Sequence, residues 1–220
     1  MLSLLAVSFD AQDPDRLAQF WGSLLGRSVD EGTQIGLRFV SSEAEKTAPN
    51  RVHLHLTSDS LPDQQQSVAM ALDLGARHVD VGQLPEEGHV VLADPEGNEF
   101  CVIEPDNDFL AGCGFLGEIA CVGTRDVGLF WSEALGWPLV WDQDQETAIQ
   151  SPHGGTKVAW GGQPRSSQPV ATRQRLDVLA DGDRDAELDR LVSLGATRLR
   201  VDERGTVVLT DPDGTEFTVR

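Results

Sequence analysis

An internal repeat constrains this chain more than any other feature, because three sequence blocks occur twice and in the same order. The blocks are Phe-Trp-x-x-x-Leu-Gly at residues 20–26 and 130–136, Leu-Gly-Ala at 74–76 and 194–196, and Asp-Pro-acidic-Gly-x-Glu-Phe at 94–100 and 211–217. Ordered recurrence at this spacing is typical of duplicated structural units. We therefore predict two tandem modules, residues 1–108 and 114–220, with their boundary near residues 105–114, where Pro, Asn, Asp and Gly are concentrated.

Each predicted module alternates between helical and strand patterns. Asp13 and Pro14 predict a helix start, and Gly26 predicts its end. Thr124 and Gly136 bound the corresponding stretch of the second module. The second helix of each module is predicted at residues 62–74 and 183–194. Short segments between the helices alternate between apolar and polar residues, which predicts half-buried strands and an α+β fold.

The net charge and the cysteine content limit which classes of binding partner and which cellular compartment are expected. The chain has 17 basic and 36 acidic residues, a formal net charge of −19, which disfavours nucleic acid and anionic membranes as partners. The acidic surface is compatible with cationic ligands. Alternatively, it only keeps the protein soluble. No apolar stretch approaches the ~20 residues of a membrane span, and the N-terminus lacks the basic region of a signal peptide. Three cysteines without metal-finger spacing indicate reduced thiols, so we expect a cytoplasmic protein.

The repeated motifs resemble the vicinal oxygen chelate superfamily, which includes glyoxalase I, bleomycin- and fosfomycin-resistance proteins and extradiol dioxygenases. The resemblance is carried by Asp13-Pro14, Phe20-Trp21 and Leu25-Gly26, by the segment from Asn50 to Leu56, and by the Asp-Pro-acidic-Gly-x-Glu-Phe ending of both copies. It is strongest to the glyoxalase-like branch. It implies two βαβββ units per module, which form a cupped mixed sheet with helices on the outer face. In some relatives the units pair crosswise between modules.

The resemblance also implies a divalent metal site with ligands at three strand positions. These positions are occupied by Ala6, His53 and Cys101 in the first module and by Glu118, Arg175 and Thr218 in the second. Neither module holds a complete set of ligands. If the units pair crosswise, His53, Cys101 and Glu118 would come together and bind Zn, Ni, Mn or Fe. In the alternative interpretation, His53 is a hydrogen-bonded pocket residue without a metal.

Other side chains are candidates for ligand binding on the polar face of the sheets. They are His53, His55, Trp141, Trp160, Arg175 and Asp177. The two histidines share one strand face, so they would bind a ligand or act as acid and base. The tryptophans would stack on aromatic or cationic ligands, or else pack in the core. Cys101 is either a nucleophile or an inert buried thiol, and the sequence fixes no basic partner near it.

These observations favour a glyoxalase-like protein that binds a small organic molecule, cationic or aromatic, in a cupped sheet without a complete catalytic metal set. Sequestration of the bleomycin-resistance kind is one form of this function, and catalysis without metal is another. The alternative is a metal-dependent lyase, isomerase or dioxygenase that uses the crossed His53, Cys101 and Glu118 site. A third hypothesis is a module kept for oligomerisation. Because two modules are fused in one chain, we expect either a monomer that resembles a dimer of modules or a homodimer. No catalytic residue is assigned.

Overall fold

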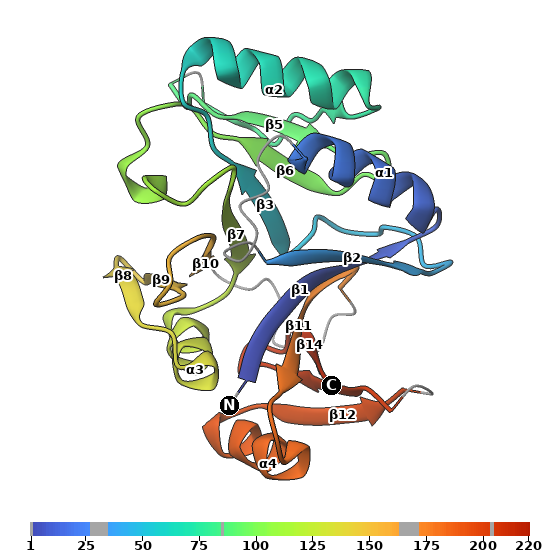
Figure 1. Cartoon of the computed structure of the whole chain (residues 1–220), viewed down its shortest axis with the longest axis vertical. Helices are drawn as coiled ribbons and strands as arrows, with labels where there is room; N and C mark the ends of the chain where they lie inside the picture. Colours follow the sequence, from blue (N-terminus) through green and yellow to red (C-terminus); the bar gives the residue numbers. More distant parts are fainter. Residues whose placement is uncertain (1, 27–34, 85, 163–171, 203–204) are drawn as a thin grey trace.

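The computed structural model describes residues 2–26, 35–84, 86–162, 172–202 and 205–220, and within them the chain forms two β-sheets and four α-helices (Figure 1). The first module contributes β1 (Leu2–Ala11), α1 (Pro14–Leu25) and β2 (Gly36–Ser41), followed by β3 (Val52–Leu56), α2 (Leu61–Asp73), β4 (Arg77–His78), β5 (Val90–Ala93) and β6 (Glu99–Val102). A 3₁₀ turn, η1 (Asp108–Leu110), lies between the modules.

The second module has a similar order, except that three strands follow its first helix where the described residues of the first module form one. It contributes β7 (Leu116–Val122), α3 (Arg125–Leu135), β8 (Leu139–Gln143), β9 (Glu146–Gln150) and β10 (Lys157–Gly161), followed by β11 (Gln174–Ala180), α4 (Arg184–Leu194), β12 (Thr197–Val201), β13 (Val207–Thr210) and β14 (Glu216–Val219). The observed helices lie close to the predicted ranges. The predicted α+β fold of tandem units is therefore confirmed.

The units pair crosswise, so each sheet is shared by both modules rather than formed within one. The second unit of the first module joins the first unit of the second module in an eight-stranded sheet, in the order β4-β5-β6-β3-β7-β10-β9-β8. The remaining two units form a six-stranded sheet, in the order β12-β13-β14-β11-β1-β2. The central junctions are the antiparallel pairs of β3 with β7 and of β1 with β11. The first and last strands of the chain thus lie in the same sheet.

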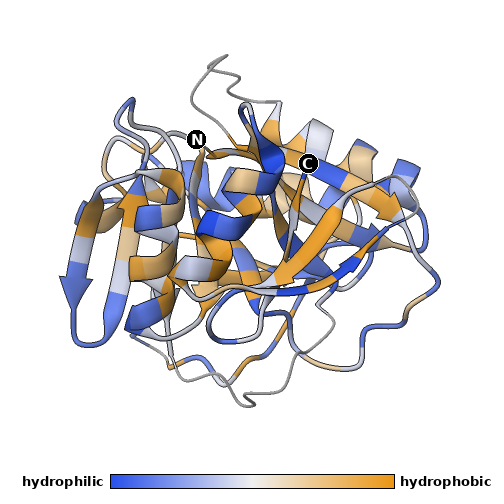
Figure 2. Cartoon of the chain, turned by 90° about the horizontal axis from the view of Figure 1, so that it is seen from below, coloured by the Kyte–Doolittle hydropathy of each residue, from blue (hydrophilic) through white to orange (hydrophobic). Residues whose placement is uncertain are grey.

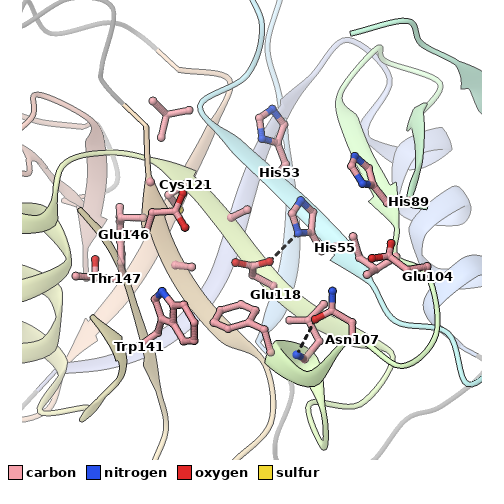
Figure 3. A pocket seen from close by; sticks show the side chains of 18 residues that line it. His53, His55, His89, Glu104, Asn107, Glu118, Cys121, Trp141, Glu146 and Thr147 are labelled. Atoms are coloured by element: carbon pink, nitrogen blue, oxygen red, sulfur yellow. Dashed lines mark hydrogen bonds and ion pairs between the residues drawn. The ribbon is translucent and has the colours of Figure 1, made fainter. Parts of the chain in front are cut away.

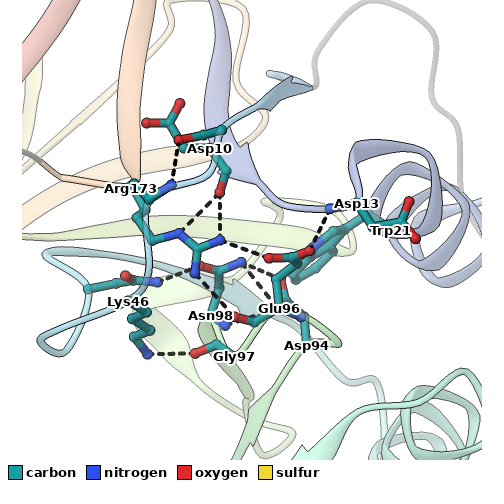
Figure 4. A network of polar contacts seen from close by, with 12 residues as sticks. Asp10, Asp13, Trp21, Lys46, Asp94, Glu96, Gly97, Asn98 and Arg173 are labelled. Carbon is teal, nitrogen blue, oxygen red and sulfur yellow. Dashed lines mark hydrogen bonds and ion pairs between the residues drawn. The ribbon is translucent and has the colours of Figure 1, made fainter.

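The repeated Trp and Asp residues hold the two units of each module together across the two sheets. Trp21 on α1 is 1% exposed, and its Nε1 donates to Asp94 Oδ2 at 3.1 Å (Figure 4). The other carboxylate oxygen of Asp94 accepts the backbone N–H of Asn98 at 2.9 Å. In the second module Trp131 makes the same hydrogen bond to Asp211. Burial raises the pKa of both carboxyl groups, that of Asp211 to about 6.

Aromatic packing surrounds each of these hydrogen bonds. Trp21 meets Phe100 of β6 edge-on at 5.0 Å between ring centroids, and Trp131 meets Phe217 of β14 at 4.9 Å. Figure 2 shows that hydrophobic residues concentrate on the central strands, whereas the helices carry both hydrophobic and hydrophilic residues. The core therefore lies between the helices and the sheets, and the predicted core positions of Trp21 and Trp131 are confirmed.

Polar contacts join the two sheets at the junction of the modules. Arg173, just before β11, donates to the backbone oxygen of Asp10 at 2.9 Å and to Glu96 Oε2 at 2.8 Å (Figure 4). Glu96 also accepts the backbone N–H of Asp13 at 2.9 Å, next to the start of α1. One arginine thus links the six-stranded sheet to the β5–β6 turn of the eight-stranded sheet.

Two helix ends differ from the sequence expectations. The predicted cap Thr124 makes no capping hydrogen bond, because its hydroxyl and backbone N–H both donate to the carboxylate of Asp213. Gly136 ends α3 with φ +66°, in the left-handed region that favours glycine, whereas Gly26 stays in the right-handed helical region. Among the described residues, no helix combines the length and apolar character needed to cross a membrane.

Candidate functional site

A cavity of about 560 Å³ lies on the polar face of the eight-stranded sheet (Figure 3). Alternation along β3 places His53 and His55 in its wall, while Val52, Leu54 and Leu56 are almost fully buried on the opposite face. Because β3 pairs with β7 of the second module, residues of both strands line the cavity. Other lining residues include His89, Glu104, Asn107, Phe109, Glu118, Ala120, Cys121, Trp141, Glu146, Thr147, Ala159, Trp160 and Gly161.

The central polar contact of the cavity is an ion pair across the crossed junction. His55 on β3 lies opposite Glu118 on β7, and His55 Nδ1 is 2.7 Å from Glu118 Oε2. On its other side, His55 is in register with Cys101 on β6 and forms a hydrogen bond with it. Burial alone would lower the pKa of His55, but the hydrogen bonds to Cys101 and Glu118 and the charge of Glu118 raise it to about 10. His55 is therefore an imidazolium at neutral pH.

The neighbouring histidine has the opposite character. Burial lowers the pKa of His53, and the positive charges of His55 and Lys46 lower it further, against an opposing effect of Glu99. His53 is therefore a neutral ring at neutral pH. The wall formed by β3 thus offers a ligand one imidazole that can accept a hydrogen bond, next to one that carries charge.

The predicted tryptophans occupy different parts of the wall. Trp141 is 38% exposed, and its ring meets Phe109 edge-on at 5.7 Å. The ammonium group of Lys157 lies 4.4 Å from the centre of the Phe109 ring. Trp160 also borders the cavity, but it is 2% exposed and stacks on Trp131 at 6.3 Å. Trp141 is therefore the aromatic side chain with the larger surface available to a ligand, and Trp160 belongs mainly to the core.

Acidic side chains also line the cavity. Glu104 and Glu146 contribute carboxylates in addition to Glu118. The Oε2 atom of Glu104 is buried, and within the described part of the chain it has no hydrogen-bond partner. In Figure 3, Glu104 lies near His89 on the side of the cavity away from Glu146. Because the Glu118 charge is balanced by His55, Glu104 and Glu146 leave an excess of negative charge in the walls.

Arg175 and Asp177 lie in the other sheet and do not line this cavity. Asp177 is 1% exposed and accepts hydrogen bonds from the hydroxyls of Ser8 at 2.6 Å and Thr218 at 2.5 Å. It also forms ion pairs with Arg38 and Arg220, at 3.0 and 3.3 Å. Arg175 pairs with Asp10 at 2.8 Å. The six-stranded sheet thus uses these polar groups in contacts within the protein.

The crossed pairing brings together the strands that carry His53, Cys101 and Glu118, but His53 lies opposite Ala120. Glu118 instead contacts His55 directly. Ligands on a tetrahedral metal, bound at about 2.0–2.2 Å, lie ~3 Å or more apart, so a 2.7 Å contact leaves no room for an ion between these two donors. Within the described ranges, no group of three or more His, Cys, Asp or Glu side chains is arranged to hold a metal ion. The residues therefore do not fit the metal site that the resemblance implies.

Several residues that line the cavity were not predicted from the sequence. Glu104, Asn107 and Phe109 lie in the irregular segment between β6 and β7, which has no periodicity to assign side chains to a face. Glu146 begins β9, directly after the turn that joins it to β8 at the end of the sheet. The position of Glu104 and Phe109 in the segment that joins the modules was the one sequence feature that could have indicated a place in the cavity.

Each unit runs from a strand through a helix into further strands, and two units share each sheet, an arrangement consistent with the vicinal oxygen chelate fold. The chain belongs to the glyoxalase-like domain family, whose model matches residues 6–103 and 118–220.

Solved structures agree with this membership at the level of the fold. Glyoxalase I from Zea mays is similar with a TM-score of 0.68 and 13% identity, over 100% of this chain and 92% of that chain. A Bacillus subtilis protein described as a candidate dioxygenase is similar with a TM-score of 0.59 and 11% identity, over 99% of this chain and 84% of that chain. No curated protein matches. At these identities the similarity concerns the fold alone.

Proposed function

We propose that this protein binds a flat, cationic organic molecule in the cavity of the eight-stranded sheet and holds it without a metal. The observation that carries the proposal is the combination of the exposed Trp141 ring with the unpartnered carboxylate oxygen of Glu104 in one cavity. An aromatic face attracts a cation through its quadrupole, and a carboxylate in a partly dry wall attracts it through charge. The acidic net charge of −19 would favour the approach of such a ligand.

The cavity size is consistent with this proposal. Sites for drug-sized molecules have volumes of about 300–1,000 Å³ and combine apolar walls with a few polar groups. The cavity of about 560 Å³ lies within that range. A neutral His53 and the amide of Asn107 supply hydrogen-bonding groups that would orient the molecule. Sequestration of a small molecule is the form of function that these groups support best.

A binding assay with two flat probes of opposite charge tests the proposal. We expect proflavine, a cation, to bind and to change Trp fluorescence, while 9-anthracenecarboxylate, an anion of similar size, binds at least about tenfold more weakly. Trp141→Ala should weaken proflavine binding about tenfold, and Glu104→Gln about fivefold.

The matched control is Glu133→Gln, which removes the same charge from an exposed position on α3. This variant should bind proflavine as the unmodified protein does. Equal affinity for the two probes would contradict the proposal. Unchanged proflavine binding in Trp141→Ala would also contradict it, because the aromatic wall would then contribute nothing.

A further inference from the structure

Three side chains that carry chemistry lie in one row across adjacent strands of the eight-stranded sheet. His55 on β3 is in register with Cys101 on β6 and with Glu118 on β7. Residues in register on neighbouring strands project from the same face, so their side chains meet. We propose that Cys101, His55 and Glu118 form a thiol–imidazole–carboxylate triad in which Cys101 is a nucleophile toward conjugated carbonyl compounds.

Glu118 is the positioning member of the triad. It binds His55 Nδ1 at 2.7 Å, and this contact fixes the ring orientation and leaves the second ring nitrogen for Cys101. A nucleophile bonded to a base, with the base oriented by a third group, is the arrangement that activates cysteine and serine nucleophiles. Here the arrangement depends on the crossed pairing, because Glu118 comes from the second module and the other two residues come from the first.

The other two cysteines have different surroundings. Cys113 is 2% exposed and accepts a long contact from Gln150 Nε2 at 3.7 Å. Cys121 donates to the backbone oxygen of Ile119 at 3.9 Å. Burial raises the pKa of both thiols, which disfavours the reactive thiolate form. These two residues are therefore internal references against which the reactivity of Cys101 can be measured.

Two of the three triad members line the proposed binding cavity, and the third lies next to them in the sheet. His55 and Glu118 line that cavity, and Cys101 is partly exposed beside His55. The triad therefore rests on the proposed function in one respect, that the cavity admits a small molecule. The aromatic wall at Trp141 suits flat, conjugated compounds, which are also the compounds that thiolates attack.

The reaction is an addition that needs no oxidant and no leaving group. The reacting form pairs the Cys101 thiolate with the His55 imidazolium, and the Cys101 sulfur forms a bond to the β-carbon of a conjugated carbonyl compound. The electron pair of the carbon–carbon double bond moves toward the carbonyl oxygen. The resulting enolate takes a proton from the His55 imidazolium, so sulfur and a proton are added across the double bond. His55 then recovers a proton from water and regains its charged form.

Labelling with N-ethylmaleimide, followed by intact-mass and peptide mass spectrometry, tests the triad. At pH 7 and one equivalent of reagent, we expect Cys101 to be labelled at least tenfold faster than Cys113 or Cys121. His55→Gln should slow the labelling of Cys101 about tenfold or more, and Glu118→Gln should slow it severalfold. Cys113→Ser should retain the fast phase, because Cys113 lies outside the triad.

Each variant is checked for folding by its thermal unfolding transition and Trp fluorescence. Faster labelling of Cys113 or Cys121, or an unchanged Cys101 rate in folded His55→Gln, would overturn the triad. Should both substituted proteins unfold, the unmodified protein still decides, since a Cys101 rate no higher than that of free cysteine at pH 7 overturns the proposal. Proflavine has no conjugated carbonyl group, so its binding reports the cavity and maleimide labelling reports the triad. The failure of the binding proposal and the failure of the triad are therefore distinguishable.

Discussion

At the scale of single residues, the protonation of His55 depends on neighbours that are distant in the sequence. Alternation predicted that His53 and His55 share a face, and the structure places both in the cavity wall. Which of the two meets Glu118 depends on the register of β3 against β7, and that register shifts next to His55. A sequence without partner information cannot fix a register to one residue, so the implied metal set named His53 where the structure pairs His55.

The raised pKa of His55 predicts a pH dependence of stability. The pKa in the folded state is about 10, above the ordinary value of 6.5, so the folded protein retains a proton that the unfolded chain loses. The stabilisation by His55 is complete below about pH 6.5 and is lost as the pH rises toward 10. The free energy of unfolding should fall between these values by at most about 1.4 kcal/mol per pH unit from this group.

Urea unfolding at pH 6 to 10 measures this dependence. In His55→Gln the decline should be shallower, while His153→Gln, which changes an exposed histidine, should follow the unmodified protein. Parallel curves for His55→Gln and the unmodified protein would show that His55 carries no extra proton when folded.

At the scale of elements, equivalent helices of the two modules have different packing requirements. Gly22 on α1 has open space around it, whereas a Cβ atom on Gly128 of α3 would lie 1.8 Å from Thr147 Oγ1 on β9. The helix positions themselves were predicted from caps and periodicity. The close approach of α3 to β9 was not, because a glycine inside a helix does not reveal which strand lies against it.

Alanine at these two glycines should therefore have opposite effects. Gly22→Ala should stabilise the protein by up to about 1 kcal/mol, because alanine loses less backbone entropy in a helix. Gly128→Ala should destabilise it by about 1–3 kcal/mol, because α3 and β9 must move apart in a packed core. Chemical denaturation of both variants measures the difference. Equal effects would mean that α3 does not pack on Thr147 as closely as the structure indicates.

At the scale of the whole molecule, the tandem modules were predictable from the repeat, but their crossed pairing was not. Strands β1 and β7 each begin a unit, and β3 could pair with either of them. The choice depends on contacts between units, such as the Trp21–Asp94 hydrogen bond and the Arg173 bridge. These contacts link residues from different units that lie far apart in the sequence, and no local sequence pattern predicts them.

The pairing of the units also explains why some candidate residues lie in the cavity and others do not. Arg175 and Asp177 were expected at a ligand site because they lie on a polar strand face. Asp177 is instead enclosed by Ser8, Arg38 and Thr218, which come from three other strands. Polar residues on a cupped face serve binding or structure according to which partners the topology brings to them.

The central claim is that β3 of the first module pairs with β7 of the second and so builds the cavity. Disulfide mapping tests this most directly, in a background where Cys101, Cys113 and Cys121 are replaced by Ser. His53 and Ala120 are register partners, and antiparallel partners lie about 4.5–5.5 Å apart at Cα, within reach of a disulfide. His53→Cys with Ala120→Cys should form a disulfide under mild oxidation, and His53→Cys with Ser8→Cys, the partner that pairing within one module would give, should not. The reverse result would show that the units pair within each module and would contradict the account.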